Sequence, residues 1–285
     1  MATRMNRRYA NVSDPARGSW RAAAALAVLV IGLGGCATPA ERFAEAAHTM
    51  NLQQEIATGS GFRHLLYWKN RSRESPVLHV YVDGDGTVNI AGYPAAEPTP
   101  RNPLVLRLLA LDPGPAVLVG RPCYYGLAGD PSCGPELWTD ARYSEAVVES
   151  MAAVVRRLAS EGGYRQVAWF GHSGGGTIAM LAAARVPESA AVVTVAANLD
   201  IDAWTDSRGA RHLAGSLNPA RQPALPDTVV QRHYAGGRDE IVPPEVTRRG
   251  LNGASDLTVI ADYDHRCCWE KFWPSVLADL AKAGL

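Results

Sequence analysis

The feature that most constrains the fold of this chain is a regular alternation of strand-like and helix-like segments from residue 62 to the C-terminus. Short runs rich in aliphatic and aromatic residues alternate with longer segments in which apolar residues recur every three or four positions. The expected strands cover 62–70, 77–86, 116–120, 166–171, 190–199, 228–236 and 257–263, and the expected helices cover 103–112, 142–162, 175–186 and 269–284. This order predicts an α/β fold, in which helices cover both faces of a mainly parallel sheet.

Two segments of the expected domain, residues 58–285, fit the alternation less well. The strand at 62–70 is expected to lie at an edge of the sheet. The segment 200–227 has no strand pattern, but it carries four large apolar residues, Trp204, Leu213, Leu217 and Leu225. We therefore expect a small lid insertion over residues 200–227.

The N-terminal 35 residues have the pattern of a signal peptide. Five of the 28 basic residues precede position 36, against one of the 28 acidic residues. A run of twelve apolar residues at 22–33 follows these arginines, and this length suits a signal-peptide core but is too short to cross a bilayer. We therefore predict that the chain is exported.

The sequence Leu-Gly-Gly-Cys ends this segment at Cys36 and resembles the bacterial lipobox. In a lipobox the cysteine receives a lipid and becomes the new N-terminus, so the body of the protein would be anchored to a membrane by lipid. An ordinary signal peptide with an incidental cysteine is the alternative. Residues 36–57 are expected to form a tether and a short helix. Ala37 in the next position favours the outer membrane, with the protein facing the periplasm.

Export also makes disulfide bonds possible. Cys123 and Cys133 flank a loop rich in Gly and Pro, and they are the expected pair. The adjacent Cys267 and Cys268 have two alternatives, a vicinal bridge or two free thiols. These four cysteines lack the repeated C-x₂-C spacing of structural zinc sites, so we expect no metal.

The charge of the chain argues against a nucleic-acid partner. The formal net charge is zero, and the part after the predicted signal peptide is mildly acidic. Nucleic-acid binding needs a clustered basic face, and none is evident. The glycine-rich segment at 171–176 lacks the lysine of a phosphate-binding loop, so we also expect no nucleotide cofactor.

Ser173 is the candidate nucleophile. It lies in the sequence Gly-His-Ser-Gly-Gly, between an expected strand and an expected helix. A strand, a sharp turn and a helix are the context of a nucleophile elbow, in which small residues on either side allow the turn and the close packing of the helix. A plain glycine-rich bend is the alternative interpretation.

The candidate acid is Asp239, which follows the expected strand at 228–236. Asp200 and Asp202, at the end of the preceding strand, are the competing acids. The candidate base is His265, which follows the last expected strand. His172 is next to Ser173 in sequence, but neighbouring side chains on such a turn are expected to point apart. The order Ser173, Asp239, His265 is the order of a catalytic triad in this kind of sheet.

The chain resembles the α/β-hydrolase superfamily over about residues 60–285, through "GHSGG", "GGRDEIVPP" and "DYDHRCCW". More narrowly, "YVDGDG" and "GRPCYY" resemble uncharacterised bacterial lipoprotein-like members. The resemblance implies that Ser173 attacks an acyl carbon, that His265 transfers the proton and that Asp239 orients His265. A serine hydroxyl needs such an oriented base because it is too weakly acidic to react unaided.

The resemblance also implies an oxyanion hole. One donor is the backbone N–H of Gly174, and the second comes from the loop Asp-Gly-Asp-Gly, from either Gly84 or Asp85. Two carboxylates in this loop would oppose a developing oxyanion unless they point away or are paired. Arg121 is a plausible partner for one of them.

These residues predict a serine hydrolase that cleaves an ester or a similar acyl bond of a small-molecule substrate. A peptidase or a thioesterase would use the same triad, because fold does not fix the reaction. A non-catalytic envelope protein that binds through this fold is the rival from another class. A third interpretation has Cys267 or Cys268 as a reactive thiol.

Overall fold

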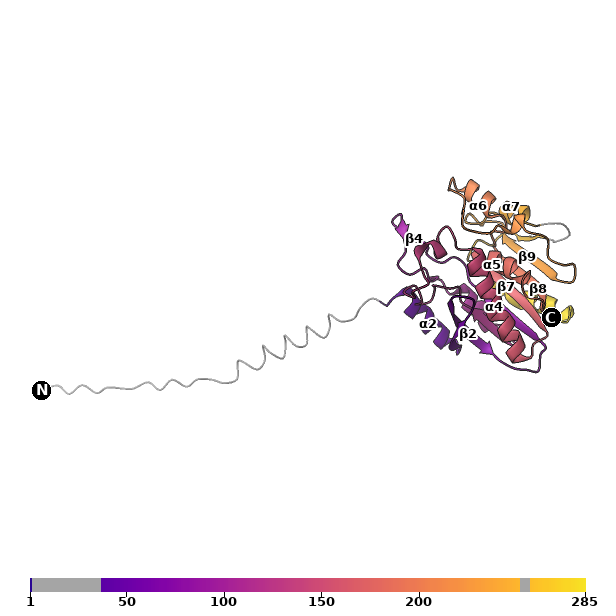
Figure 1. Ribbon diagram of the computed structural model, residues 1–285, viewed down its shortest axis with the longest axis horizontal. Coiled ribbons are helices and arrows are strands. Elements are labelled where there is room, and N and C mark those ends of the chain that lie inside the picture. Colours follow the sequence, from indigo (N-terminus) through magenta and orange to yellow (C-terminus); the bar gives the residue numbers. More distant parts are fainter. Residues whose placement is uncertain (2–36, 252–256) are drawn as a thin grey trace. The chain divides into compact units, whose positions relative to one another are not determined.

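The computed structural model describes residues 1, 37–251 and 257–285, and the expected signal peptide and Cys36 lie outside this part. Residues 38–285 belong to one unit, and its centre is an eight-stranded sheet with the strand order β1-β2-β6-β3-β7-β8-β9-β10 (Figure 1). The first two pairings, β1 with β2 and β2 with β6, are antiparallel, and all the others are parallel. The predicted α/β fold with a mainly parallel sheet is confirmed.

The strands of this sheet are β1 (Gln53–Thr58), β2 (Arg63–Asn70), β3 (Val77–Val82), β6 (Ala116–Val119), β7 (Gln166–His172), β8 (Ser189–Val195), β9 (Val230–Gly236) and β10 (Leu257–Ile260). A separate two-stranded hairpin is formed by β4 (Asn89–Ile90) and β5 (Tyr93–Pro94). The helices are α2 (Pro39–Thr49), α3 (Leu104–Ala110), α4 (Glu145–Gly162), α5 (Gly174–Ala183), α6 (Ile201–Ser207), α7 (Pro244–Arg249) and α8 (Trp269–Lys282). Short 3-10 turns cover Pro135–Trp138 and Pro219–Arg221.

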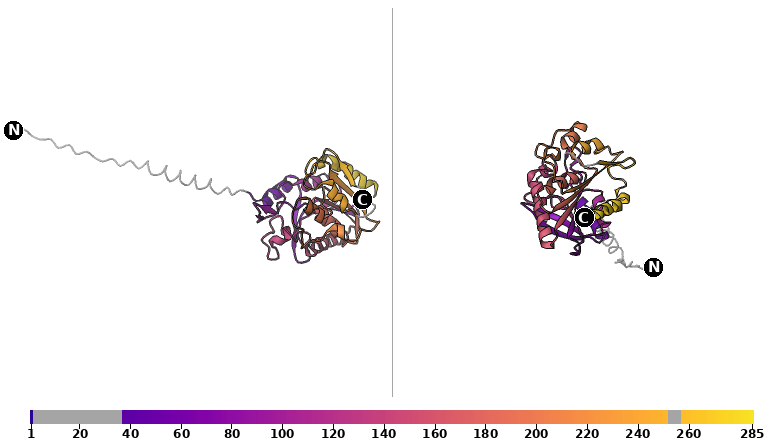
Figure 2. Two further views of the ribbon diagram at one scale, coloured as in Figure 1. Left: turned by 90° about the horizontal axis from the view of Figure 1, so that it is seen from above. Right: turned by 90° about the vertical axis from the view of Figure 1, so that its right-hand side faces the viewer.

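Helices cover the two faces of the sheet (Figure 2). Helix α5 packs on β7 and β8 and is itself covered by α4, while α3 and α8 pack together on the opposite face, near β3 and β6. The central strand β3 is buried along its whole length, as expected for a parallel strand with helices above and below it. Beneath α8, Tyr81 and Phe170 are stacked, and Trp273 packs its edge against Phe170.

The edge of the sheet differs from the prediction. The segment 62–70 forms β2, which lies inside the sheet between β1 and β6, so its assignment as an edge strand was wrong. The edge strand is β1, in a segment predicted to be tether. Its sequence QQEIAT buries only Ala57, so it lacks the apolar alternation by which a strand is recognised. The short helix α2 was predicted, and its Phe43 packs in the core with Tyr67 and Tyr125.

The parallel strands bring the candidate catalytic residues together at the carboxyl ends of the sheet. Strands β3, β7, β9 and β10 run in the same direction, so the loops that follow them meet at their carboxyl ends. The loop after β7 carries Ser173, the loop after β9 carries Asp239, and the loop after β10 carries His265. Over the described residues, the helices include none that is both long enough and apolar enough to cross a membrane.

Candidate active site

Ser173 occupies a strained turn between β7 and α5. Its φ of 54° and ψ of −127° lie where non-glycine residues are rarely found. The turn is possible because Gly171 and Gly175, two residues before and after Ser173, have no side chains. An added Cβ on Gly171 would lie 2.5 Å from the amide nitrogen of Gly176, and one on Gly175 would lie 2.1 Å from the carbonyl oxygen of Val82. The backbone N–H of Ser173 donates to Val195 on the neighbouring strand, which holds the turn against the sheet.

Asp239 and His265 form a buried pair on the loops after β9 and β10. The distance from Nδ1 of His265 to Oδ2 of Asp239 is 2.8 Å, and the two residues are 8% and 4% exposed. The other carboxylate oxygen of Asp239 accepts the backbone N–H groups of Ile241 and Val242, at 2.8 Å each. An ionised carboxylate only accepts, so Nδ1 of His265 carries a proton and Nε2 is left as the basic nitrogen.

The competing acids are engaged elsewhere. Asp200 caps α6 by accepting from the N–H of Ala203, and it also accepts from Asn218. Asp202 forms an ion pair with Arg221. Neither contacts a histidine of the Ser173 region, so the choice of Asp239 over these two acids agrees with the geometry.

A cavity of about 540 Å³ opens over the turn. Ser173 and His265 both line it, and the facing wall is the loop 83–86, which was predicted to supply an oxyanion donor. Of the four apolar residues of the predicted lid, only Trp204 reaches this cavity. Its indole N–H donates to the carbonyl oxygen of Ile241, which ties α6 to the Asp239 loop.

The loop after β3 comes very close to the nucleophile. A Cβ on Gly84 would lie 3.2 Å from Cβ of Ser173, so a side chain at this position would crowd the serine. The backbone N–H of Gly84 donates to its neighbour Asp83, at 2.8 Å from Oδ1. Of the two predicted second donors, Gly84 therefore already has an acceptor. The N–H of Asp85 has none among the described residues.

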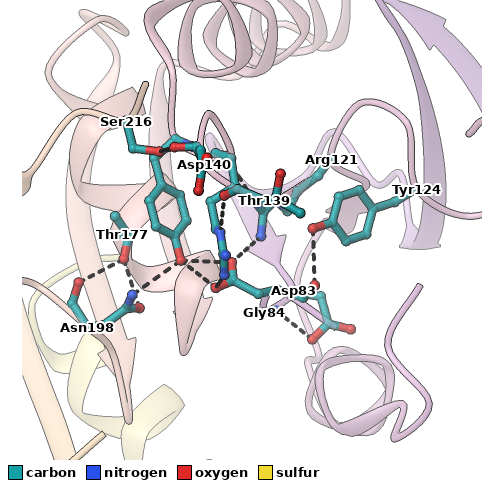
Figure 3. A network of polar contacts seen from close by, with 12 residues as sticks. Asp83, Gly84, Arg121, Tyr124, Thr139, Asp140, Thr177, Asn198 and Ser216 are labelled. Carbon is teal, nitrogen blue, oxygen red and sulfur yellow. Dashed lines mark hydrogen bonds and ion pairs between the residues drawn. The ribbon is translucent and has the colours of Figure 1, made fainter. Parts of the chain in front are cut away.

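Asp85 is held by a cluster of buried polar groups, of which Arg121 and Asn198 are labelled in Figure 3. Its Oδ1 lies 2.6 Å from Nη1 of Arg121, and its Oδ2 lies 2.9 Å from Nη1 of Arg142. The hydroxyl of Tyr143 lies 2.7 and 2.6 Å from the two carboxylate oxygens and also accepts from Asn198 at 3.2 Å. The predicted pairing with Arg121 is confirmed. Arg142 and Tyr143 were missed, because they lie 57 and 58 residues away and no local pattern marks them.

This cluster changes the electrostatics of the loop. Burial alone would raise the pKa of Asp85, but Arg142 and Arg121, with the Tyr143 hydroxyl, outweigh burial and lower it to about 2. Two guanidinium groups surround this one carboxylate, so the cluster as a whole carries a positive charge. Asp85 thus does not present an uncompensated negative charge to the space above Ser173.

Asp83 has the opposite environment. It is 3% exposed, and its Oδ2 has no hydrogen-bond partner among the described residues. Burial raises the pKa of Asp83 to about 7, although the Gly84 N–H and the positive charges of Arg121 and Arg107 act against this rise. The pKa values of the two acids of the loop are therefore shifted in opposite directions.

His172 lines the same cavity as Ser173. Its ring lies 4.9 Å from the ring of His265, centroid to centroid, and its Nε2 lies 2.9 Å from the carbonyl oxygen of His265. A carbonyl oxygen only accepts, so Nε2 carries the proton and donates. Burial, together with His265, lowers the pKa of His172 to about 3, so this ring stays neutral and supports the His265 loop. No local sequence pattern marks this role beyond adjacency to Ser173.

The cysteines form two disulfide bonds in the described part of the chain. Cys123 is bonded to Cys133, with a Cα–Cα distance of 5.6 Å. Cys267 is bonded to Cys268, so of the two alternatives the structure has the vicinal bridge. Within residues 37–251 and 257–285, no group of three or more His, Cys, Asp or Glu residues is placed to hold a metal ion.

Comparison with known proteins agrees with this geometry. The family model described as serine aminopeptidase, S33, matches residues 139–249, which include Ser173 and Asp239 but not His265. No curated protein sequence gives a significant match.

Three solved structures share the fold at low sequence identity. A bacterial membrane phospholipase A is 16% identical, with a TM-score of 0.56, covering 92% of this chain and 98% of its own. An esterase from Pyrococcus furiosus is 14% identical, with a TM-score of 0.55 and coverage of 87% and 96%. A putative lipase from Acinetobacter baumannii is 13% identical, with a TM-score of 0.55 and coverage of 87% and 97%. The chain therefore has the α/β-hydrolase fold.

Proposed function

We propose that this protein is a serine hydrolase that cleaves an ester or a similar acyl bond through Ser173, His265 and Asp239. The observation that carries the proposal is that Ser173 and His265 line one cavity, while Asp239 engages Nδ1 of His265 and leaves Nε2 free to act as a base. An adjacent oriented base is what a serine hydroxyl requires to become a nucleophile.

The proposed reaction has two halves. Oγ of Ser173 attacks the acyl carbon while its proton moves to Nε2 of His265, and the resulting tetrahedral intermediate carries a negative oxygen. Its collapse breaks the bond to the alcohol, which leaves with the proton from His265, and an acyl-enzyme remains. Water then attacks the acyl carbon with His265 as base, which releases the acid and restores Ser173.

The N–H groups of Gly174 and Asp85 are the proposed oxyanion donors. Gly174 is the first residue of α5, where backbone N–H groups have no partner within the helix. Asp85 is preferred to Gly84 because Gly84 donates to Asp83. One such donor is worth about 3–4 kcal/mol of transition-state stabilisation, so the position of the loop 83–86 bears directly on the rate.

A peptidase acting on free amino termini is a weaker candidate, although the matching family model is described as a serine aminopeptidase. Such a substrate carries an ammonium group near the scissile bond, and its binding calls for an unpaired acid. Neither of the two acids that line the cavity is both unpaired and fully ionised at neutral pH. Asp85 is neutralised by two arginines, and Asp83 has a pKa raised to about 7 by burial.

Turnover of 4-nitrophenyl butyrate tests the proposal. The Ser173→Ala variant should lose activity by roughly 10⁵- to 10⁶-fold, because removing the nucleophile of a triad removes the covalent pathway. Ser275→Ala is the matched control, since the Ser275 hydroxyl lies on α8 and donates only to Phe272. No turnover by the wild-type protein at any pH from 5 to 9 would favour the non-catalytic binding protein.

We also propose that the protein is exported and anchored by a lipid on Cys36, at the outer membrane and facing the periplasm. The motivating pattern is the apolar run at 22–33 followed by Leu-Gly-Gly-Cys. Expression with an alkyne-labelled fatty acid tests this proposal. Label should appear in the wild-type protein and be absent from Cys36→Ser, and equal labelling of both would contradict lipidation at Cys36.

A further inference from the structure

Two arginines on the wall of the catalytic cavity have no use in the proposed chemistry. Arg101 and Arg266 both line the cavity and are both exposed. Neither side chain makes a hydrogen bond or an ion pair with any residue that the structure describes. Most arginines near them differ in this respect, because Arg142 is bound to Asp85 and Arg107 to Glu270.

The two arginines lie in segments that are connected by helix packing and by hydrogen bonds. Arg101 lies just before α3, and Arg266 lies just before α8, and these two helices pack against each other. Arg107 bridges the two loops, because its Nη2 donates to Asn102 at 2.9 Å and its Nε donates to Glu270 at 2.6 Å. Arg101 precedes Asn102 directly, and Arg266 lies four residues before Glu270. The two segments that carry Arg101 and Arg266 are therefore held near each other, and both residues line the cavity.

The charged residues that line the cavity also favour an anionic ligand. Its lining contains two acids, Asp83 and Asp85, and three arginines, Arg101, Arg142 and Arg266. Asp85 is neutralised by Arg142 and by Arg121, which lies behind the wall. The nearby Asp264 uses one carboxylate oxygen to accept the N–H groups of Arg266 and Cys267. The arginines of the lining thus outnumber its acids, and neither Arg101 nor Arg266 forms an ion pair with a described side chain.

The rest of the lining suits the apolar part of a small ester. Val88 and Leu104 lie on the side of the 83–104 segment, and Trp204 and Ile241 lie on the side of the lid. A positive wall beside apolar surface, with Ser173 between them, fits a ligand that has an anionic group close to its acyl bond.

We propose that the natural substrate is an ester that carries a carboxylate or a phosphate, and that Arg101 and Arg266 bind this anionic group. The inference rests on the proposed acyl-transfer function and adds the class of substrate. Guanidinium groups suit this role, because they stay charged and offer paired donors to carboxylate and phosphate oxygens.

Two pairs of substrates test the inference and separate the two anions. The first pair is 4-nitrophenyl butyrate and mono-4-nitrophenyl succinate, which differ by a carboxylate on the acyl side. The second pair is 1-butyrylglycerol and its 3-phosphate, which differ by a phosphate on the alcohol side. In at least one pair, kcat/KM for the anionic ester should exceed that for the neutral ester about fivefold or more at low salt, and 0.5 M NaCl should reduce this preference because it screens exposed charges.

The variants Arg101→Gln and Arg266→Gln should each lower the ratio of anionic to neutral kcat/KM by about three- to fivefold, and the double variant by about tenfold. Taking the ratio removes any effect of Arg266 on its neighbour His265, because both esters use the same base. Replacement by Lys should keep most of the preference. Arg165→Gln is the matched control, since Arg165 is an exposed arginine just before β7, at the opposite end of the strand from Ser173.

The outcomes distinguish this inference from the proposed function. If the neutral esters are turned over but the double variant keeps the wild-type ratio, the role of the two arginines is overturned while the serine hydrolase stands. If neither anionic ester is preferred by the wild-type protein, the substrate class is wrong. If no ester of either pair is turned over, the proposed function fails, and the substrate class fails with it.

Discussion

The two loops that face each other at the candidate active site are built by different means. The nucleophile loop, residues 171–176, keeps its shape through glycine, because three of its four glycines lie against backbone or Ala197 with no room for a Cβ. The facing loop, residues 83–86, keeps its shape through charge. Asp85 lies between two buried arginines and a tyrosine, and Asp83 is buried beside it without a cation in contact.

The two loops should therefore be sensitive to different substitutions. The nucleophile loop should respond to added volume and be indifferent to pH and charge. The facing loop also has little room for added volume at Gly84 and Gly86, and in addition it should respond to any change that unbalances the charges of the cluster. The two loops meet at Gly175, where an added Cβ would lie 2.1 Å from the carbonyl oxygen of Val82 and 2.6 Å from that of Asp83.

The largest effect is expected from Asp85→Asn. This change leaves the guanidinium groups of Arg121 and Arg142, whose side chains are 1% and 7% exposed, without their counter-charge. We expect the free energy of unfolding at pH 7 to fall by about 3–5 kcal/mol, measured by urea denaturation.

The pH dependence of this effect follows from the pKa of Asp85, which is lowered to about 2. A lowered pKa stabilises the fold above the ordinary value near 4 and loses that contribution as the pH falls towards 2, so the difference from the wild type should shrink in acid. Asp130→Asn is the control, because its partner Arg63 is about half exposed, and it should cost less than about 1 kcal/mol. Equal losses in both variants would show that the Asp85 cluster is no more important than a surface pair.

The pH dependence of the stability of Asp83→Asn should be opposite in sign to that of Asp85→Asn. Burial raises the pKa of Asp83 to about 7, so the folded protein keeps a proton that the unfolded chain releases near pH 4. The wild-type protein should therefore lose stability through this residue as the pH rises from about 4 to 7. The variant has no carboxyl group at this position, so it does not lose this contribution. Its free energy of unfolding relative to that of the wild type should therefore improve by roughly 2–4 kcal/mol over that range. Melting temperatures of both proteins from pH 4 to 8 measure this, and parallel curves would contradict it.

Gly175→Ala tests the junction of the two loops. A methyl group there must displace backbone rather than a flexible side chain, so we expect a loss of about 1–3 kcal/mol of stability. We also expect a loss of turnover larger than the loss of folded protein, because Gly175 packs against Val82 and Asp83 and its displacement would shift the loop that faces Ser173. Gly129→Ala is the matched control, since nothing lies within 4 Å of a Cβ at position 129. Similar behaviour of the two variants would show that the junction is not tightly packed.

The smallest effect is expected from Tyr143→Phe. It removes the hydroxyl that lies within hydrogen-bond distance of both oxygens of Asp85, but it keeps both arginines and the packing of the ring. A hydrogen bond to a charged group is worth about 1.5–3 kcal/mol, and the arginines compensate part of it, so we expect a loss of about 1 kcal/mol. A loss as large as that of Asp85→Asn would indicate that the tyrosine, rather than the charge, holds the loop.

The sequence predicts the nucleophile loop better than the facing loop for a physical reason. A strand, a glycine-rich turn and a helix are adjacent in the chain, so the context of Ser173 is visible in thirteen residues. The partners of Asp85 come from the loops at 121 and 142–143, and only the fold brings them together. Arg121 could be predicted as a partner of Asp85 because it follows the neighbouring strand. Arg142 and Tyr143 precede a helix, and no sequence pattern identifies them as partners.

The same reasoning explains the error at the edge of the sheet. The strand β1 is polar and mostly exposed, so apolar alternation does not identify it, and β2 was predicted to be the edge strand. The contact of His172 was not predicted, because it is made with the loop of His265, 93 residues away in the sequence.

The most direct test of this account is to find which residue reacts with a fluorophosphonate probe. The labelled protein would be digested, and the modified peptide identified by mass spectrometry. The account predicts one adduct per molecule, on Ser173, with none after Ser173→Ala and much slower formation after His265→Ala. An adduct on another residue, or labelling that persists in Ser173→Ala, would contradict the claim that the turn after β7 carries the nucleophile.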